Sequence, residues 1–103
     1  MIPSVREWDQ KYRDEGLVII GVHTPEFKYE RDLANVQQAM AELGVTWPVA
    51  LDNDWTTWRA YSNRYWPAMY LIDKRGDIRH LKIGEGGYAH TEAIIQALLA
   101  EPM

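Results

Sequence analysis

Apolar residues recur at helical spacing along the first stretch of the chain. Val5, Trp8 and Tyr12 share one face of a helix, and charged residues occupy the opposite face. Gly16, which follows, is the residue type that most often ends a helix. The pattern therefore predicts a helix over residues 3–15.

The next stretch, residues 17–22, is apolar at every position and rich in β-branched side chains. A strand with one face in water alternates apolar and polar residues, and this stretch does not. We therefore expect a strand that is covered on both faces, as in a parallel or mixed α/β sheet. Residues 23–26 then form a loop at the carboxyl end of this strand.

The rest of the chain continues this alternation of helices and strands. The pattern predicts a helix over 30–43, an extended segment over 47–51, a helix over 55–65, strands over 68–73 and 78–83 joined by a tight turn, and a last helix capped by Thr91. The run Asp52, Asn53 and Asp54 offers a cap to the helix over 55–65, and Pro67 prevents that helix from continuing. This order of elements indicates an α/β fold.

Length and charge narrow the possible functions. The chain of 103 residues is expected to form one domain, residues 1–103. Its 15 acidic residues outnumber the 11 basic ones, which are scattered, so nucleic-acid binding is not expected. No apolar run approaches the roughly 20 residues that cross a bilayer, and the first residues do not resemble a signal peptide. We therefore expect no membrane association and a cytoplasmic location for the chain as given.

The sequence contains no cysteine. This absence excludes disulfides, zinc–thiolate sites and thiol catalysis by these residues. Aromatic residues are 12% of the chain, and all except Phe27 are Trp or Tyr. Such side chains pack like hydrophobic residues but keep a polar group, which suits core edges, grooves and interfaces.

Four segments carry a resemblance to a known family: Val5–Trp8, Gly21–Phe27, Tyr61–Pro67 and Gly84–Tyr88. In this order they resemble thioredoxin-like domains of the TlpA, alkyl-hydroperoxide-reductase and DipZ type. The resemblance covers nearly the whole chain. It implies a thioredoxin-like α/β sandwich and relatives that are often exported or membrane-attached.

The chain departs from this family in one respect. Its members begin with a central strand that leads into a Trp-Cys-x-x-Cys motif at the start of the first helix, whereas this chain opens within that helix. We therefore expect a thioredoxin-like sandwich that lacks the N-terminal central strand and both cysteines. In the family, the absent strand lies between the counterparts of residues 17–22 and 68–73.

The strongest single feature is Pro67. In thioredoxin-like proteins the matching proline follows a cis peptide bond, and the backbone beside it pairs with a polypeptide. The resemblance thus implies a cis bond between Trp66 and Pro67. The expected binding surface comprises this dipeptide and the aromatic residues around it, Tyr65, Trp58 and Trp55.

Other polar residues offer weaker candidates. His23, Glu26, Gly86 and Tyr88 are possible loop contacts, but a His–Glu pair without a nucleophile or metal is usually an ordinary polar loop. His80 and His90 lack the spacing of paired metal ligands, so no metal site is expected.

Two sequence patterns match known sites only in part. The run from Asp52 begins like a calcium loop, but its sixth and twelfth positions are Thr57 and Asn63 instead of Gly and Glu. Residues 84–89 match G-x-G-x-x-A, but no second parallel strand follows that could form a dinucleotide fold. No cofactor is expected.

The sequence therefore favours a non-catalytic module that binds a protein or peptide or assists assembly. Two alternatives stay open. The chain could be a piece of a thiol–disulfide oxidoreductase whose Cys-x-x-Cys lies upstream of residue 1. It could also bind a small ligand in an aromatic pocket formed by Trp55, Trp58, Tyr61 and Trp66.

The missing strand also predicts a homodimer. Residues 17–22 need a neighbour along at least one edge, and an open apolar edge invites association with another edge. A second copy would supply that neighbour by symmetry. We expect the first helix, with Trp8 and Tyr12, to be displaced or exchanged between the two copies.

Overall fold

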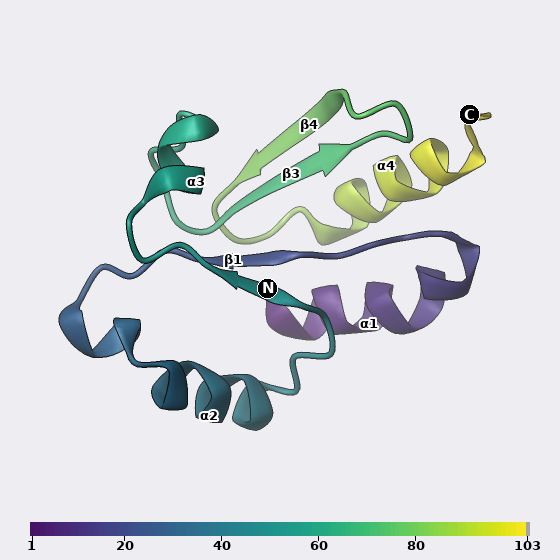
Figure 1. The fold of residues 1–103 in the computed structure, drawn as a ribbon. Coiled ribbons are helices and arrows are strands. Elements are labelled where there is room, and N and C mark those ends of the chain that lie inside the picture. Colours follow the sequence, from purple (N-terminus) through teal and green to yellow (C-terminus); the bar gives the residue numbers. More distant parts are fainter. Residues whose placement is uncertain (103) are drawn as a thin grey trace.

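The structure is a computed structural model that describes residues 1–102 (Figure 1). Its elements, in chain order, are α1 (Ile2–Tyr12), the short 3₁₀ helix η1 (Arg13–Glu15), β1 (Gly21–His23), the 3₁₀ helix η2 (Lys28–Arg31), α2 (Leu33–Leu43), β2 (Val49–Leu51), α3 (Thr56–Ala60), β3 (Ala68–Ile72), β4 (Ile78–Ile83) and α4 (Tyr88–Ala100). None of these helices has both the length and the hydropathy that crossing a bilayer requires.

The strands form two separate pairs. β1 lies parallel to β2, and β3 lies antiparallel to β4. Within residues 1–102 no strand pairing joins the two pairs, so β1 and β3 each keep one free edge. Figure 1 shows these two edges facing each other across the middle of the molecule. Residues 17–22 therefore do not pair with residues 68–73.

The core lies on one side of the strands, where α1 and α4 meet (Figure 1). Trp8, Tyr12 and Ile95 are buried there together, and Met69 and Leu71 of β3 pack against them. In the single chain the apolar face of α1 completes this core. The displacement or exchange of this helix in a homodimer stays a prediction.

A carboxylate holds the same two helices together. Glu92 of α4 accepts hydrogen bonds from the indole of Trp8 (3.2 Å), the ammonium of Lys11 (2.8 Å) and the hydroxyl of Tyr12. Lys11 most strongly, and then Tyr12, lower the pKa of Glu92 below its ordinary value. The amide of Gln96 donates to the same tyrosine oxygen. α1 thus joins α4 through polar as well as apolar contacts.

The segment 17–22 differs from its prediction. Only Gly21–His23 forms strand pairs, and His23, which was expected in the following loop, ends the strand. The covering of both faces is wrong for these residues, because Val18, Ile20 and Val22 are exposed. Every second apolar side chain of this segment is thus left in solvent.

Two helix boundaries also differ from their predictions. α3 ends at Ala60 because Ser62 adopts a left-handed conformation, with φ 52°, and Asn63 N–H bonds back to the carbonyl of Trp58. α4 begins at Tyr88, after Gly87 with φ 64°. Thr91 is therefore not its cap; it lies in the first turn, fully buried, and its hydroxyl donates to the carbonyl of Gly87.

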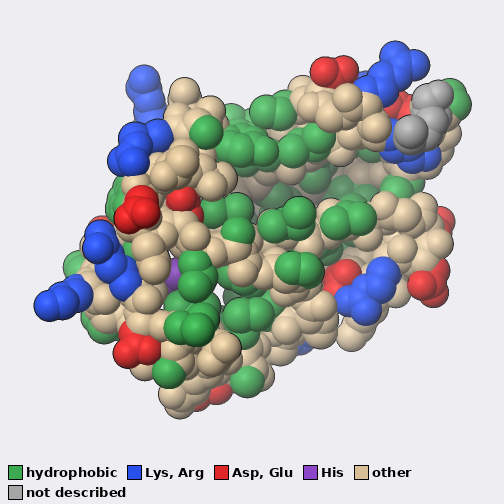
Figure 2. Space-filling view, viewed as in Figure 1, with side chains coloured by type: hydrophobic (Ala, Val, Ile, Leu, Met, Phe, Trp, Pro, Cys, Tyr) green, Lys and Arg blue, Asp and Glu red, His purple; other side chains and the backbone are tan. Residues whose placement is uncertain are grey.

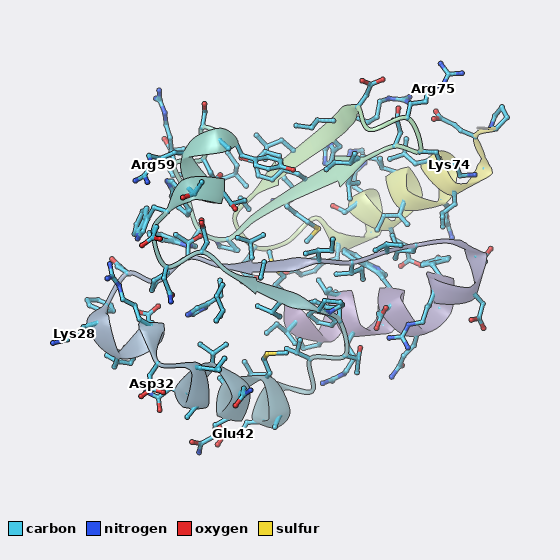
Figure 3. The ribbon with its side chains drawn as sticks, in the orientation of Figure 1. Lys28, Asp32, Glu42, Arg59, Lys74 and Arg75 are labelled. Atoms are coloured by element: carbon cyan, nitrogen blue, oxygen red, sulfur yellow. The ribbon has the colours of Figure 1, made fainter. Side chains whose placement is uncertain are left out.

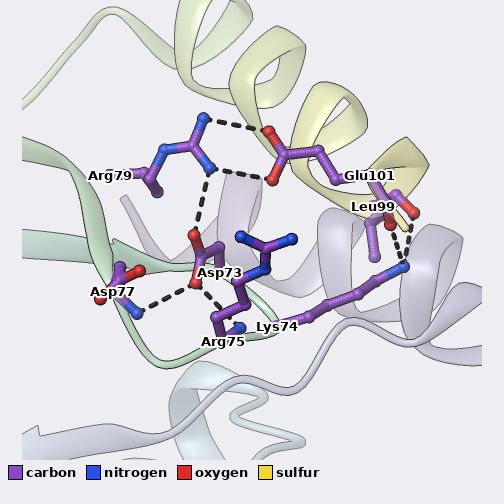
Figure 4. Close-up of polar contacts among 7 residues, drawn as sticks. All are labelled: Asp73, Lys74, Arg75, Asp77, Arg79, Leu99 and Glu101. Atoms are coloured by element: carbon purple, nitrogen blue, oxygen red, sulfur yellow. Dashed lines mark hydrogen bonds and ion pairs between the residues drawn. The ribbon is translucent and has the colours of Figure 1, made fainter. Parts of the chain in front are cut away.

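The turn of the β3–β4 hairpin is fastened to the end of α4 (Figure 4). The carboxylate of Asp73 accepts from the backbone N–H groups of Arg75 and Asp77, at 2.9 and 3.0 Å, and so shapes the turn. Arg79 bridges Asp73 and Glu101. The ammonium of Lys74 donates to the carbonyl of Leu99, in the last turn of α4, and to that of Glu101, just after it, where cations are favoured. These contacts therefore hold the β3–β4 hairpin against the end of α4.

Candidate functional site

The segment before β3 carries the dipeptide to which the sequence analysis gave most weight. The peptide bond between Trp66 and Pro67 is cis, and the carbonyl of Pro67 accepts from the N–H of Gly84 at 2.8 Å. Tyr65 and Trp66 are exposed. The dipeptide thus lies at the start of β3, next to the strand's free edge.

Three tryptophans form a cluster beside this segment. The ring centroids of Trp58 and Trp66 lie 4.2 Å apart, those of Trp55 and Trp58 5.1 Å apart, and those of Trp55 and Trp66 5.5 Å apart. Tyr61 does not join this cluster by stacking; its ring packs on Tyr70 at 4.9 Å. Rings this close contact one another directly. Since Trp66 is exposed, the tryptophan cluster forms part of the protein surface.

A buried aspartate positions this cluster. Asp52, with 4% of its surface exposed, accepts from the N–H groups of Thr57 and Trp58 and from the hydroxyl of Thr24, each at 2.9 Å. Burial raises the pKa of Asp52, but these three hydrogen bonds outweigh it and hold that pKa below its ordinary value. The predicted capping role thus belongs to Asp52, although the first residue outside α3 is Trp55. The contact with Thr24 joins residues 28 positions apart and had no signal in the sequence.

The loop after β1 does not form a catalytic pair. The Nε2 of His23 lies 2.8 Å from the carbonyl oxygen of Glu30, to which it donates. The backbone N–H groups of Glu26 and Phe27 donate to the carboxylate of Glu30, at 3.4 and 3.3 Å. Glu30, which the sequence analysis passed over, therefore organises this loop, and the polar contacts of His23 and Glu26 are part of its folding.

Of the two candidate residues expected in the loop before α4, only one lies in that loop. Gly86 lies in the loop with φ 94°, a conformation that favours glycine. Tyr88 begins α4, and its ring meets that of Trp8 edge-on with 6.2 Å between centroids. Tyr88 is thus a half-buried helix residue at the edge of the core, and its assignment to the loop is wrong.

Exposed apolar side chains lie along the free edges of β1 and β3. Val18 is 77% exposed, Ile20 63% and Val22 48%, all on the segment that ends in β1. On the hairpin, β3 exposes Ile72, whereas the exposed Leu81 and Ile83 lie on β4, on the other side of β3. Figure 2 shows hydrophobic side chains on both sides of a hollow between the hairpin and the β1 segment. We call the free edge of the β1 segment, with Val18, Ile20 and Val22, together with the free edge of β3, the open edge.

Six charged residues lie away from the open edge. Figure 3 labels Lys28, Asp32, Glu42, Arg59, Lys74 and Arg75, and all of them lie at the outer ends of the molecule. The N–H of Gly21 donates to the carbonyl of Pro48, and the carbonyl of His23 accepts from Asp52. Since neighbouring strands pair through alternate residues, the N–H and C=O groups of Val22, between these two, point away from β2. The open edge thus combines apolar side chains with backbone groups that no other strand pairs within residues 1–102.

Comparisons with known proteins agree on one group of relatives. A family model described as Redoxin matches residues 1–99. The protein DipZ of Mycobacterium tuberculosis is 53% identical over 98 residues, which are 95% of this chain but 14% of DipZ. The thiol-disulfide oxidoreductase YkuV of Bacillus subtilis is 34% identical over 97% of this chain and 67% of its own length.

Solved structures give the same result for the fold. The solution structure of a thioredoxin-like protein in the oxidised form matches 99% of this chain and 68% of its own length, with a TM-score of 0.86 and 33% identity. The crystal structure of a thioredoxin-like superfamily protein matches 98% of this chain and 70% of its own length, with a TM-score of 0.87 and 26% identity.

Proposed function

Because the chain belongs to the redoxin family and has a thioredoxin-like α/β fold, we propose that it is a strand-accepting module. In this role it binds one extended, apolar polypeptide segment between β1 and β3 and carries out no chemistry of its own. The family and fold expected from the sequence are confirmed. The binding role rests on the open edge.

The physical case for this role is the cost of leaving the open edge uncovered. Burying a valine or isoleucine side chain contributes about 1.5–3 kcal/mol relative to leaving it exposed. A strand between β1 and β3 would cover Val18, Ile20 and Val22 and pair the backbone groups of both edges. Apolar, β-branched residues at alternate positions would suit a strand beside Val18, Ile20 and Val22.

The chemical case concerns the missing thiol. Thiol–disulfide exchange needs a thiolate as nucleophile, and these 103 residues contain no cysteine. The chain by itself should therefore reduce insulin disulfides and consume peroxide at the rate of the protein-free control. Activity above that rate would contradict a purely binding role.

A second function is favoured by the relatives. Since YkuV is named a thiol-disulfide oxidoreductase, the accepted strand could itself carry the redox cysteines. The chain would then supply the surface around Trp66 and Pro67, and another polypeptide segment would supply the thiolate. The small-ligand alternative stays a prediction, as does the cellular location.

Synthetic strands test the proposal. One peptide has seven alternating Val, Ile and Thr residues with a lysine at each end, and its matched control has proline at the central position. We expect the first peptide to slow amide hydrogen exchange at Val18, Ile20 and Val22, and the control to leave it unchanged, because proline lacks the N–H that pairs. Equal effects of the two peptides, or no protection by either, would contradict strand acceptance.

A third peptide separates the two functions. It extends the apolar strand by Trp-Cys-x-x-Cys. If the complex with this peptide reduces insulin faster than the peptide alone, the oxidoreductase role is favoured. If it protects the same amides without any gain in rate, the binding role is favoured.

A further inference from the structure

Two of the three histidines come together on the side of the hairpin that faces α4. His80 lies in β4 and His90 in the first turns of α4, and their ring centroids are 5.9 Å apart with an angle of 76° between the planes. Ten positions divide them in the sequence, a separation that does not match the spacing of paired metal ligands. The loop between them brings them together by reversing direction through Gly84, Gly86 and Gly87, all at positive φ.

One ring nitrogen of this pair lacks a partner. The Nε2 of His80 is shielded from solvent and makes no hydrogen bond within residues 1–102. Buried polar atoms are nearly always satisfied, and an exception points to an unseen water or ion. His90 is exposed, so the pair can be reached from solvent on the α4 side.

We propose that His80 and His90 together bind a divalent transition-metal ion that prefers imidazole, with Zn²⁺ as the reference case. Neutral imidazole nitrogen is a good ligand for Zn²⁺, Cu²⁺ and Ni²⁺. The two rings stand on different elements and are close enough for side-chain rotation to direct one nitrogen of each to a shared ion. This site does not depend on strand acceptance, because it involves neither β1 nor the free edge of β3.

Water would complete the coordination from the side of the exposed His90. Within residues 1–102 no group of three histidine, aspartate or glutamate side chains gathers into a metal site. A zinc ion with two protein ligands keeps open coordination positions. The site is therefore of the exchangeable kind, and an ion in it would tie β4 to the beginning of α4.

Isothermal titration of the tag-free chain with ZnCl₂ tests the proposal. We expect one ion per chain, with affinity reduced about tenfold or more by His80→Gln or by His90→Gln. The matched control is His23→Gln, which replaces the one histidine whose Nε2 already donates to a backbone carbonyl. That variant should bind Zn²⁺ as the unsubstituted chain does.

Nuclear magnetic resonance gives a second readout. Zn²⁺ should shift the imidazole signals of His80 and His90 and leave those of His23 in place. Absence of saturable binding at millimolar ZnCl₂, or equal loss of binding in the His23→Gln variant, would overturn the proposal. If His80→Gln unfolds the chain, as circular dichroism would show, the exposed His90→Gln decides the result.

Discussion

The contact between α1 and α4 and the open edge between β1 and β3 are made from similar apolar side chains, yet they differ in what covers them. Trp8, between the helices, is 3% exposed, whereas Val18 on the open edge is 77% exposed. The polar groups differ in the same way: Glu92 collects three donors between the helices, while no strand within residues 1–102 pairs the free edge of β1.

This difference shows which part of the fold the 103 residues complete alone. Both helices of the α1–α4 contact belong to the chain. Their apolar side chains therefore bury one another, and their polar groups form hydrogen bonds with one another. Along the open edge, no strand within residues 1–102 pairs with β1 on the side that faces β3. We infer that stability resides mainly in the first region and that recognition belongs to the second.

Replacing Trp8 by alanine should have the largest effect. Trp8→Ala removes a ring buried against Tyr12 and Ile95 and takes away one donor to Glu92. Large-to-small changes of this kind in a core cost about 3–5 kcal/mol. Urea unfolding followed by circular dichroism measures the loss. A cost below about 1 kcal/mol would mean that the α1–α4 contact does not carry the stability of the chain.

The sequence alone predicts the structure correctly where a local pattern of residues determines it. The hairpin is correct because the Asp73 carboxylate and the Gly76 turn lie within a few residues of the strands they join. The buried face of α1 is correct because helical spacing alone places Trp8 and Tyr12 together. Through the family resemblance, the sequence also predicted that the central strand between residues 17–22 and 68–73 is missing.

The sequence was insufficient where distant residues decide the outcome. The end of α3 depends on Ser62 in a left-handed conformation, which glycine would have signalled and serine does not. The contacts of Asp52 with Thr24 and of His80 with His90 arise only when the chain has folded. The apolar pattern of residues 17–22 predicts more burial than the structure shows. Apolar residues indicate that burial would be favourable, but they do not show that a covering segment is present.

A charge on the open edge should have the second largest effect. We expect the chain to form a homodimer through this edge when no strand occupies it, and Ile20→Lys should weaken association at least tenfold, about 1.4 kcal/mol. The matched control is Ile78→Lys, also at an exposed isoleucine but at the start of β4. Sedimentation velocity measures both. The mass of one chain at all micromolar concentrations of the unsubstituted protein would contradict the dimer.

Acid should weaken the contact between α1 and α4. The folded-state pKa of Glu92 lies below its ordinary value, chiefly because of Lys11 and then Tyr12. The stabilisation is therefore complete above the unfolded-state value, about 4.3, and is lost as pH falls through the folded-state pKa. Glu92→Gln should lower the Tm at pH 7 and make the Tm fall less steeply between pH 5 and 3. The exposed Glu26→Gln serves as control, and an unchanged pH profile of Glu92→Gln would contradict this role.

The smallest effect should come from adding a hydroxyl to the open edge. Val18→Thr keeps the shape and the β-branching of the side chain, and water can solvate the new hydroxyl at so exposed a position. In a dilute solution of the protein, this substitution should lower the free energy of unfolding by no more than about 0.5 kcal/mol. The matched change Val36→Thr buries the same hydroxyl in α2 and should cost about 1–3 kcal/mol. Addition of the apolar strand peptide should raise the cost of Val18→Thr, because the peptide buries that side chain. Equal costs of the two changes without peptide would show that Val18 is already covered in solution, and the contrast between the two regions would then be wrong.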